Sequence, residues 1–182
     1  MNDVQKIKAD IEAARASYRP EHIKLLLIAE APPDAVKRFF YYPDVKRDDW
    51  LFMGVTEVLY PSLKQFYKTA KRPTHLKEAL LRRFRADGYY LMDLLEVPRG
   101  MYPGKWEEAA PNLLARVEQT IHKQTPIILI KTNVYDIAQP VLKKGGFNVV
   151  EERIQFPSSG QQKKFREGFQ RALTSLGWNS LT

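Results

Sequence analysis

The sequence predicts an α/β fold, specifically a three-layer α/β/α sandwich around a central, mostly parallel sheet of four strands. Two observations lead to this prediction. Short apolar runs, too continuous for a sheet with one face in water, alternate with longer segments of helical periodicity. Strands that alternate with helices form parallel sheets covered on both faces. The 182 residues contain no repeat or linker, so residues 1–182 are predicted to form a single domain.

The predicted strands are the four apolar runs. They span residues 23–29, 89–95, 126–130 and 147–154. Gly88 precedes the second run and Gly145-Gly146 precede the fourth, as expected where a helix ends and the chain turns into a strand. The first and third runs are uniformly aliphatic, which is typical of strands buried on both faces.

Segments with apolar residues at helical spacing are predicted to be helices. The first would be capped by Asn2 or Asp3 and end before Pro20. Pro61 separates the second helix from the third. The later helices are predicted over 51–60, 62–70, 74–85, 106–124, 132–144 and 161–176. Residues 31–49 form a long loop with three prolines and an aromatic cluster.

Composition narrows the class of protein. No apolar run approaches the roughly 20 residues of a membrane helix, and the first residues lack a signal-peptide core. The absence of cysteine excludes disulfides, thiolate metal sites and cysteine nucleophiles. We therefore expect a cytoplasmic protein without a cofactor or metal. The formal net charge of +8 favours a polyanionic partner, although a basic soluble protein without such a partner is an equal alternative.

Two loops that follow strands carry polar groups. Glu30 comes directly after the first apolar run and is followed by Ala31, Pro32 and Pro33. Residues 156–162 follow the fourth run and offer two serine hydroxyls before a basic helix. Ligands of open α/β sheets bind at the carboxyl ends of strands, so both loops are candidates for a binding site.

Four segments together resemble the uracil-DNA glycosylase superfamily, in a divergent form. Residues 27–33 are similar to its first motif, a strand followed by Gly-Glu-Ala-Pro-Gly or a relative. The aromatic run 39–41 follows where that family places a base-stacking aromatic, and residues 90–97 resemble its second strand, which ends in a base-reading Asn. Residues 156–160 resemble the last motif, usually His-Pro-Ser. The resemblance implies the uracil-DNA glycosylase fold over most of the chain.

This sequence departs from the family pattern at positions that the family uses to recognise and release the base. Ala29 and Pro33 replace two glycines, Asp93 replaces the Asn, and Phe156 replaces the His. An ionised Asp only accepts hydrogen bonds, so Asp93 favours a base edge with amino or ring N–H groups over uracil. Phe156 cannot donate to the departing base, and the loss of one such donor typically costs about a hundredfold or more in rate. We expect uracil excision to be weak or absent.

The resemblance implies roles for individual residues. Glu30 would orient water, Asp93 would read the base, and Phe40 or Phe39 would stack on it. Ser158 and Ser159 would hold a phosphate ahead of a helix. The implied substrate-binding residues are Ala31, Pro32, Phe39, Phe40, Phe156, Pro157, Ser158 and Ser159. The implied nucleic-acid contacts are Arg38, Lys163 and Lys164.

Each of these roles has a structural alternative. Glu30 could cap a backbone N–H or pair with Arg38, and Asp93 could cap a turn or pair with Arg99. The serines could cap the last helix, and the aromatic run could form a small core of its own. Trp50 and Phe52 are expected in the core. A second basic region on two helices could follow a phosphate backbone or be a solvated surface. It comprises Lys64, Lys68, Lys71, Arg72, Lys77, Arg82, Arg83 and Arg85.

The predicted function is therefore a DNA-binding protein that hydrolyses the N-glycosidic bond of a damaged or non-uracil base, in single- or double-stranded DNA. Two alternatives stay open. One is a catalytically inactive binding module for nucleic acid or a nucleobase on the same fold. The other is an enzyme that acts on a small nucleotide.

Overall fold

The computed structural model describes residues 3–178 and has an α/β fold. Its sheet contains three parallel strands in the order β2-β1-β3. They are β1 (Leu25–Ala29), β2 (Tyr89–Asp93) and β3 (Ile127–Leu129). Every residue of β1 and β3 is buried, as the uniform aliphatic runs predicted.

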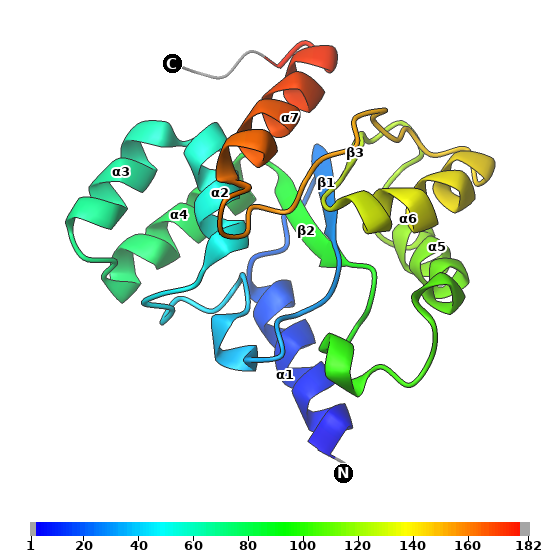
Figure 1. The fold of residues 1–182 in the computed structure, drawn as a ribbon, viewed down its shortest axis with the longest axis horizontal. Helices are drawn as coiled ribbons and strands as arrows, with labels where there is room; N and C mark the ends of the chain where they lie inside the picture. Colours follow the sequence, from blue (N-terminus) through cyan, green and yellow to red (C-terminus); the bar gives the residue numbers. More distant parts are fainter. Residues whose placement is uncertain (1–2, 179–182) are drawn as a thin grey trace.

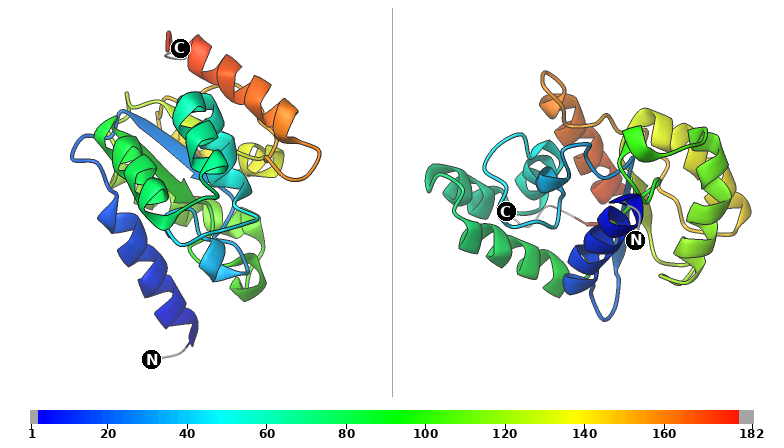
Figure 2. Two further views of the ribbon diagram at one scale, coloured as in Figure 1. Left: turned by 90° about the vertical axis from the view of Figure 1, so that its left-hand side faces the viewer. Right: turned by 90° about the horizontal axis from the view of Figure 1, so that it is seen from below.

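Helices flank this small sheet. They are α1 (Asp3–Ser17), α2 (Trp50–Leu59), α3 (Pro61–Thr69), α4 (Thr74–Ala86), α5 (Ala110–Glu118), α6 (Thr132–Lys144) and α7 (Gln162–Ser175). Figure 1 shows α2, α3 and α4 on one side of the strands and α5 and α6 on the other. The helices α1 and α7 lie at opposite ends of the molecule (Figure 2). No helix within residues 3–178 has the length and apolar character needed to cross a bilayer.

Most element boundaries follow from local chemistry. Pro61 is in the first turn of α3, where its missing N–H has no helical partner to lose. Gly88 ends α4 with φ +84°, a conformation that glycine adopts without strain. The helix expected over 106–124 is shorter, because a 3₁₀ turn, η3 (Trp106–Ala109), precedes α5 and Pro111 stands in the first turn of α5. The expected cap Asn2 lies outside the described residues.

The predicted four-stranded sheet is wrong. Segment 147–154 makes only two isolated bridges to the β3 region, Val149 with Ile127 and Ile154 with Ile130. The segment advances five residues between these bridges while the facing chain advances three, so no continuous ladder can form. The excess residues are charged and turn outward, where Glu151 pairs with Lys143 of α6 at 2.9 Å and Glu152 pairs with Arg171 of α7 at 2.7 Å.

The outer edge of β2 is closed by a side chain from the aromatic loop. The hydroxyl of Tyr41 accepts from the N–H of Leu91 at 2.8 Å and donates to the carbonyl of the same residue at 3.2 Å. Burial raises the pKa of Tyr41 well above its usual value, which keeps this hydroxyl protonated. The loop therefore replaces a neighbouring strand at this edge and prevents further pairing there.

Candidate functional site

Ionisable residues follow all three strands at the carboxyl edge of the sheet. Glu30 comes directly after β1, and Asp93 is the last residue of β2. Lys131 is the second residue after the end of β3. The N–H of Leu95 donates to the carbonyl of Glu30 at 2.9 Å, which continues the pairing of the two strands and keeps Glu30 beside Asp93. The three charged groups thus meet because parallel strands end at one edge.

The connections of the strands diverge at this edge. After β1 the chain runs through α2, α3 and α4 and returns as β2 on one side. After β3 it runs through α6 and returns as segment 147–154 on the other side. Glu30 and Lys131 therefore stand at a switch in strand order, the place where open α/β sheets form a ligand crevice.

A pocket of about 330 Å³ opens at this place. It brings together eight of the residues that the sequence singled out. They are Glu30, Ala31, Pro32, Arg38, Phe39, Phe40, Asp93 and Phe156. The volume is at the lower end of the range for small-molecule sites, about 300–1,000 Å³, and suits a ligand of the size of a nucleobase or nucleoside.

Asp93 is buried and ion-paired. Only 2% of it is exposed, and one of its oxygens accepts from Arg15 of α1 at 2.8 Å. Burial raises the pKa of Asp93, and Arg15 opposes that shift. Asp93 therefore neither caps a turn nor pairs with Arg99, the two alternatives expected from the sequence. It is a fixed hydrogen-bond acceptor in the pocket wall.

Glu30 is held by Lys131. Their side chains form an ion pair, with 14% of the Glu30 side chain and 32% of the Lys131 side chain exposed. The expected alternative partner, Arg38, instead pairs with Asp48 at 3.5 Å. Burial lowers the pKa of Lys131. Its backbone has φ +89°, a strained conformation for a non-glycine residue, and strain of this kind concentrates at functional sites.

The aromatic run is mostly core. Phe39 and Phe40 are 1% and 3% exposed, and their rings pack edge-on against Tyr41. These rings belong to the main hydrophobic core, where Phe40 contacts Phe52 and Phe84, and not to a separate small core; base stacking by them stays a prediction. Phe52 is buried as expected, but the expectation for Trp50 is wrong, because Trp50 is 38% exposed at the pocket. Trp50 offers a base more ring surface than either phenylalanine.

The loop before α7 is only partly at the pocket. Phe156 lines it, but Pro157, Ser158 and Ser159 do not. Pro157 is buried against α2, where a Cβ on Gly54 would lie 2.9 Å from its ring. The N–H of Ser158 is not free, because it donates to the carbonyl of Phe156 at 2.8 Å.

Ser158, Ser159, Lys163 and Lys164 all lie outside the pocket. The N-cap residue of α7 is Gln161, without a side-chain cap bond, so neither serine caps the helix. Lys163 and Lys164 are exposed on its first turn, outside the pocket, with Lys163 3.8 Å from Glu167. Phosphate and nucleic-acid contacts by these residues stay predictions.

A groove rich in cations adjoins the pocket. It has a volume of about 530 Å³ and shares Asp48, Asp49 and Trp50 with the pocket wall. Its cationic residues are Lys46, Arg47, Lys64, Lys68, Arg72 and Arg166. Three of them belong to the second basic region of the sequence, so part of that region forms one surface with the pocket.

The remainder of the second basic region is separate from the groove. Lys77 is fully buried, and its ammonium lies 2.5 Å from Asp49. Burial raises the pKa of Asp49 to about 6 despite Lys77. Arg83 pairs with Asp87 at 2.8 Å on the other side of α4. The wall between pocket and groove is thus anchored by a buried ion pair.

The sequence reasoning missed Arg15 and misassigned Lys77 to a basic surface, although both carried a signal of burial. Arg15 follows Ile11 by four residues, and Lys77 precedes Leu81 by four, so both cations occupy the apolar face of a helix. A charge on a buried face requires a partner. The identity of each partner, Asp93 and Asp49, is set by the tertiary fold.

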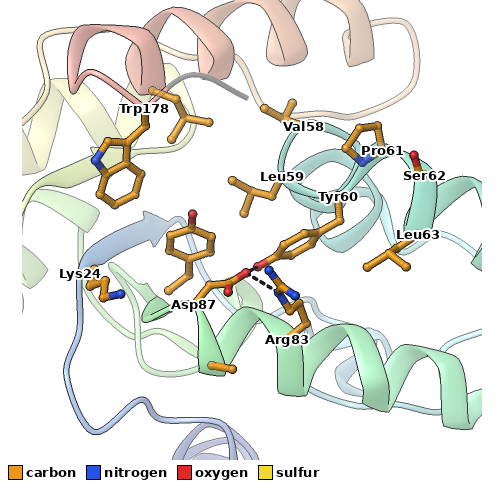
Figure 3. A pocket seen from close by; sticks show the side chains of 13 residues that line it. Lys24, Val58, Leu59, Tyr60, Pro61, Ser62, Leu63, Arg83, Asp87 and Trp178 are labelled. Carbon is orange, nitrogen blue, oxygen red and sulfur yellow. Dashed lines mark hydrogen bonds and ion pairs between the residues drawn. The ribbon is translucent and has the colours of Figure 1, made fainter. Parts of the chain in front are cut away.

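A larger cavity of about 590 Å³ lies at the opposite, amino edge of the sheet (Figure 3). Lys24, just before β1, and Tyr89, the first residue of β2, line it together with Trp178. Its acid is already engaged, because Tyr60 donates to Asp87 at 2.7 Å and Arg83 donates to the same oxygen. This cavity contains none of the predicted site residues.

Within residues 3–178, no three His, Asp or Glu side chains are grouped so that they could hold a metal ion. The polar and aromatic side chains that line the carboxyl-edge pocket are carboxylates, arginines and aromatic rings. A comparison of the chain with protein-family models, with curated proteins and with solved structures finds no match.

Proposed function

We propose that this chain is a nucleic-acid-binding N-glycosidic hydrolase whose pocket takes a base with N–H groups on its edge. One observation supports this most: Glu30 and Asp93 line one nucleobase-sized pocket that shares a wall with a cation-rich groove. The resemblance to the uracil-DNA glycosylase superfamily, and a sandwich fold of that type, belong to this proposal. The net charge of +8 agrees with a polyanionic partner.

The groove and the pocket have complementary tasks in this proposal. Lysines and arginines of the groove attract the phosphate backbone, and the exposed ring of Trp50 stacks on a base at the shared wall. The base enters the pocket, where Asp93 accepts from its N–H groups. Glu30 orients the attacking water, and Lys131 fixes the carboxylate by its ion pair.

The decisive experiment is base release from single-stranded oligonucleotides that carry a panel of modified bases and uracil. We expect release of a base with amino or ring N–H groups, and a loss of about a hundredfold or more in Glu30→Gln, the usual scale for a general base. Uracil release by wild type should be weaker than by Asp93→Asn. Robust uracil release by wild type, undiminished in Glu30→Gln, would refute the proposal.

A second candidate is a binding module without catalysis. The observation that favours it is Phe156, whose apolar ring lines the pocket where a donor to the departing base is expected. In this case fluorescence anisotropy would show tight binding of oligonucleotides with modified bases. Alkali treatment of the same samples would produce no strand scission.

A further inference from the structure

A smaller polar cavity lies on the face of β2 turned away from the pocket. Leu91 and Asp93 line the pocket, whereas Tyr90 and Met92 line this cavity, as expected for alternating side chains of one strand. Its volume is about 200 Å³. It lies between α1 and α5, which contribute Arg15 and Arg116 to its wall.

The wall of this cavity has an excess of positive charge. Arg15, Arg19 and Arg116 line it, against the single acid Glu12. Of these three arginines, only Arg15 forms an ion pair within residues 3–178. It pairs with Glu12, and with Asp93 at 2.8 Å. Like charges brought together in a partly buried place repel each other.

The guanidinium groups that line this cavity are of the kind that bind oxyanions. The Nε of Arg15 is buried, with no hydrogen-bond partner in the described part of the chain. Arg116 is fixed by bonds to Asn112 at 2.8 Å and to the Leu94 carbonyl at 2.7 Å. Burial lowers the pKa of Arg116, and the charge of Arg15 lowers it further, while the nearby carboxylates, Glu96 first among them, oppose that shift. Arg19 has the ring of Tyr90 as its neighbour, at 5.9 Å.

We propose that this cavity binds a phosphate group through Arg15, Arg19 and Arg116. Planar guanidinium forks match phosphate oxygens in pairs, and a bound dianion relieves the repulsion among the three cations. The cavity is smaller than the usual range for whole ligands, about 300 Å³ and above, so any sugar or base attached to the phosphate projects into solvent. This inference does not depend on the proposed function of the Glu30 pocket.

Glu12 competes with the phosphate in this arrangement. Its side chain is 47% exposed and engages the Nη1 of Arg15. Removal of its charge frees that nitrogen and lowers the repulsion on an incoming anion. Arg19 is exposed and has no ion pair in the described chain, so its neutralisation removes a phosphate contact without disturbing the core. The two substitutions therefore change phosphate affinity in opposite directions.

The test is isothermal titration calorimetry of the full chain with inorganic phosphate, at ionic strength held constant with chloride. We expect saturable binding to one site. Arg19→Gln should weaken it roughly two- to fivefold and Glu12→Gln should tighten it by a similar factor, the scale of exposed charge pairs. Lys144→Gln removes the same charge at an exposed position of α6, away from both the cavity and the basic groove, and should leave the affinity unchanged.

Two further titrants identify the source of the phosphate. A nucleoside 5′-monophosphate that binds more tightly than inorganic phosphate, with the same dependence on Arg19, assigns the site to a nucleotide; equal affinity assigns it to free phosphate. The matching nucleoside is the control, and Arg19→Gln should not affect it. The proposal is overturned if phosphate produces no saturable heat, or if Lys144→Gln weakens binding and Arg19→Gln does not.

Discussion

The amino and carboxyl edges of the sheet differ in the size of their cavities and in the charged side chains that line them. The amino edge has the larger cavity, about 590 Å³, with Asp87 in its wall, held by Tyr60 and Arg83. The carboxyl edge has a pocket of about 330 Å³ whose wall includes Glu30, Asp93 and Asp49. The comparison shows that strand polarity, rather than volume, decides where the charged side chains gather, because the loops that bear them begin where strands end.

The largest expected effect is on the buried ion pair in the wall of the carboxyl-edge pocket. Asp49→Asn leaves the ammonium of Lys77 buried without its carboxylate, and such a change costs about 3–5 kcal/mol in the free energy of unfolding. Urea unfolding measures it. Asp44→Asn, at an exposed carboxylate, is the control, and Asp49→Asn with Lys77→Met should recover most of the loss. A loss below 1 kcal/mol would show that the pair is solvated.

The same carboxylate makes the carboxyl edge sensitive to pH. The pKa of Asp49 is about 6 in the folded chain and near 3.8 when unfolded. Between these values the folded state retains the proton that the unfolded state has released, so this contribution to stability is full below the lower value and is lost as pH rises through the upper one. The stability of wild type relative to Asp49→Asn should decline over this interval. A relative stability that rises with pH would contradict the assignment.

Substitution of Trp50 tests whether this side chain at the pocket contributes to oligonucleotide binding as well as to stability. Trp50 is 38% exposed, so Trp50→Ala also removes packed apolar surface and should lower the unfolding free energy, whereas Trp50→Leu keeps much of that packing and removes the aromatic ring. Loss of one stacked base should weaken oligonucleotide binding by about 1–3 kcal/mol, measured by fluorescence anisotropy. Unchanged binding would restrict the stacking role to Phe39 and Phe40.

The smallest effect is expected at the amino edge. Tyr60→Phe removes the hydrogen bond to Asp87 and should cost about 1 kcal/mol in unfolding free energy, since Arg83 still satisfies the carboxylate. Base release and oligonucleotide binding should stay unchanged. Tyr102→Phe is the matched control, because the Tyr102 hydroxyl makes no hydrogen bond within residues 3–178. A loss of oligonucleotide binding in Tyr60→Phe would mean that the two edges are not independent.

Local signals predicted the elements that depend on near neighbours. Pro61 separated α2 from α3, and Gly88 ended α4, because each restricts or frees the backbone at one position. The fourth strand was wrong for the opposite reason. Strand formation requires a partner in register, and segment 147–154 advances out of step with β3.

The sequence by itself determined an α/β fold with parallel strands, and it placed Glu30 and Asp93 at strand ends, where the structure has a pocket. Periodicity and strand polarity are local properties, so they can be inferred from one chain. Only the tertiary structure decided that Arg15 pairs with Asp93, that Lys131 pairs with Glu30, and that Trp50 is exposed. These outcomes depend on contacts between residues far apart in the sequence, and local sequence patterns do not reveal such contacts.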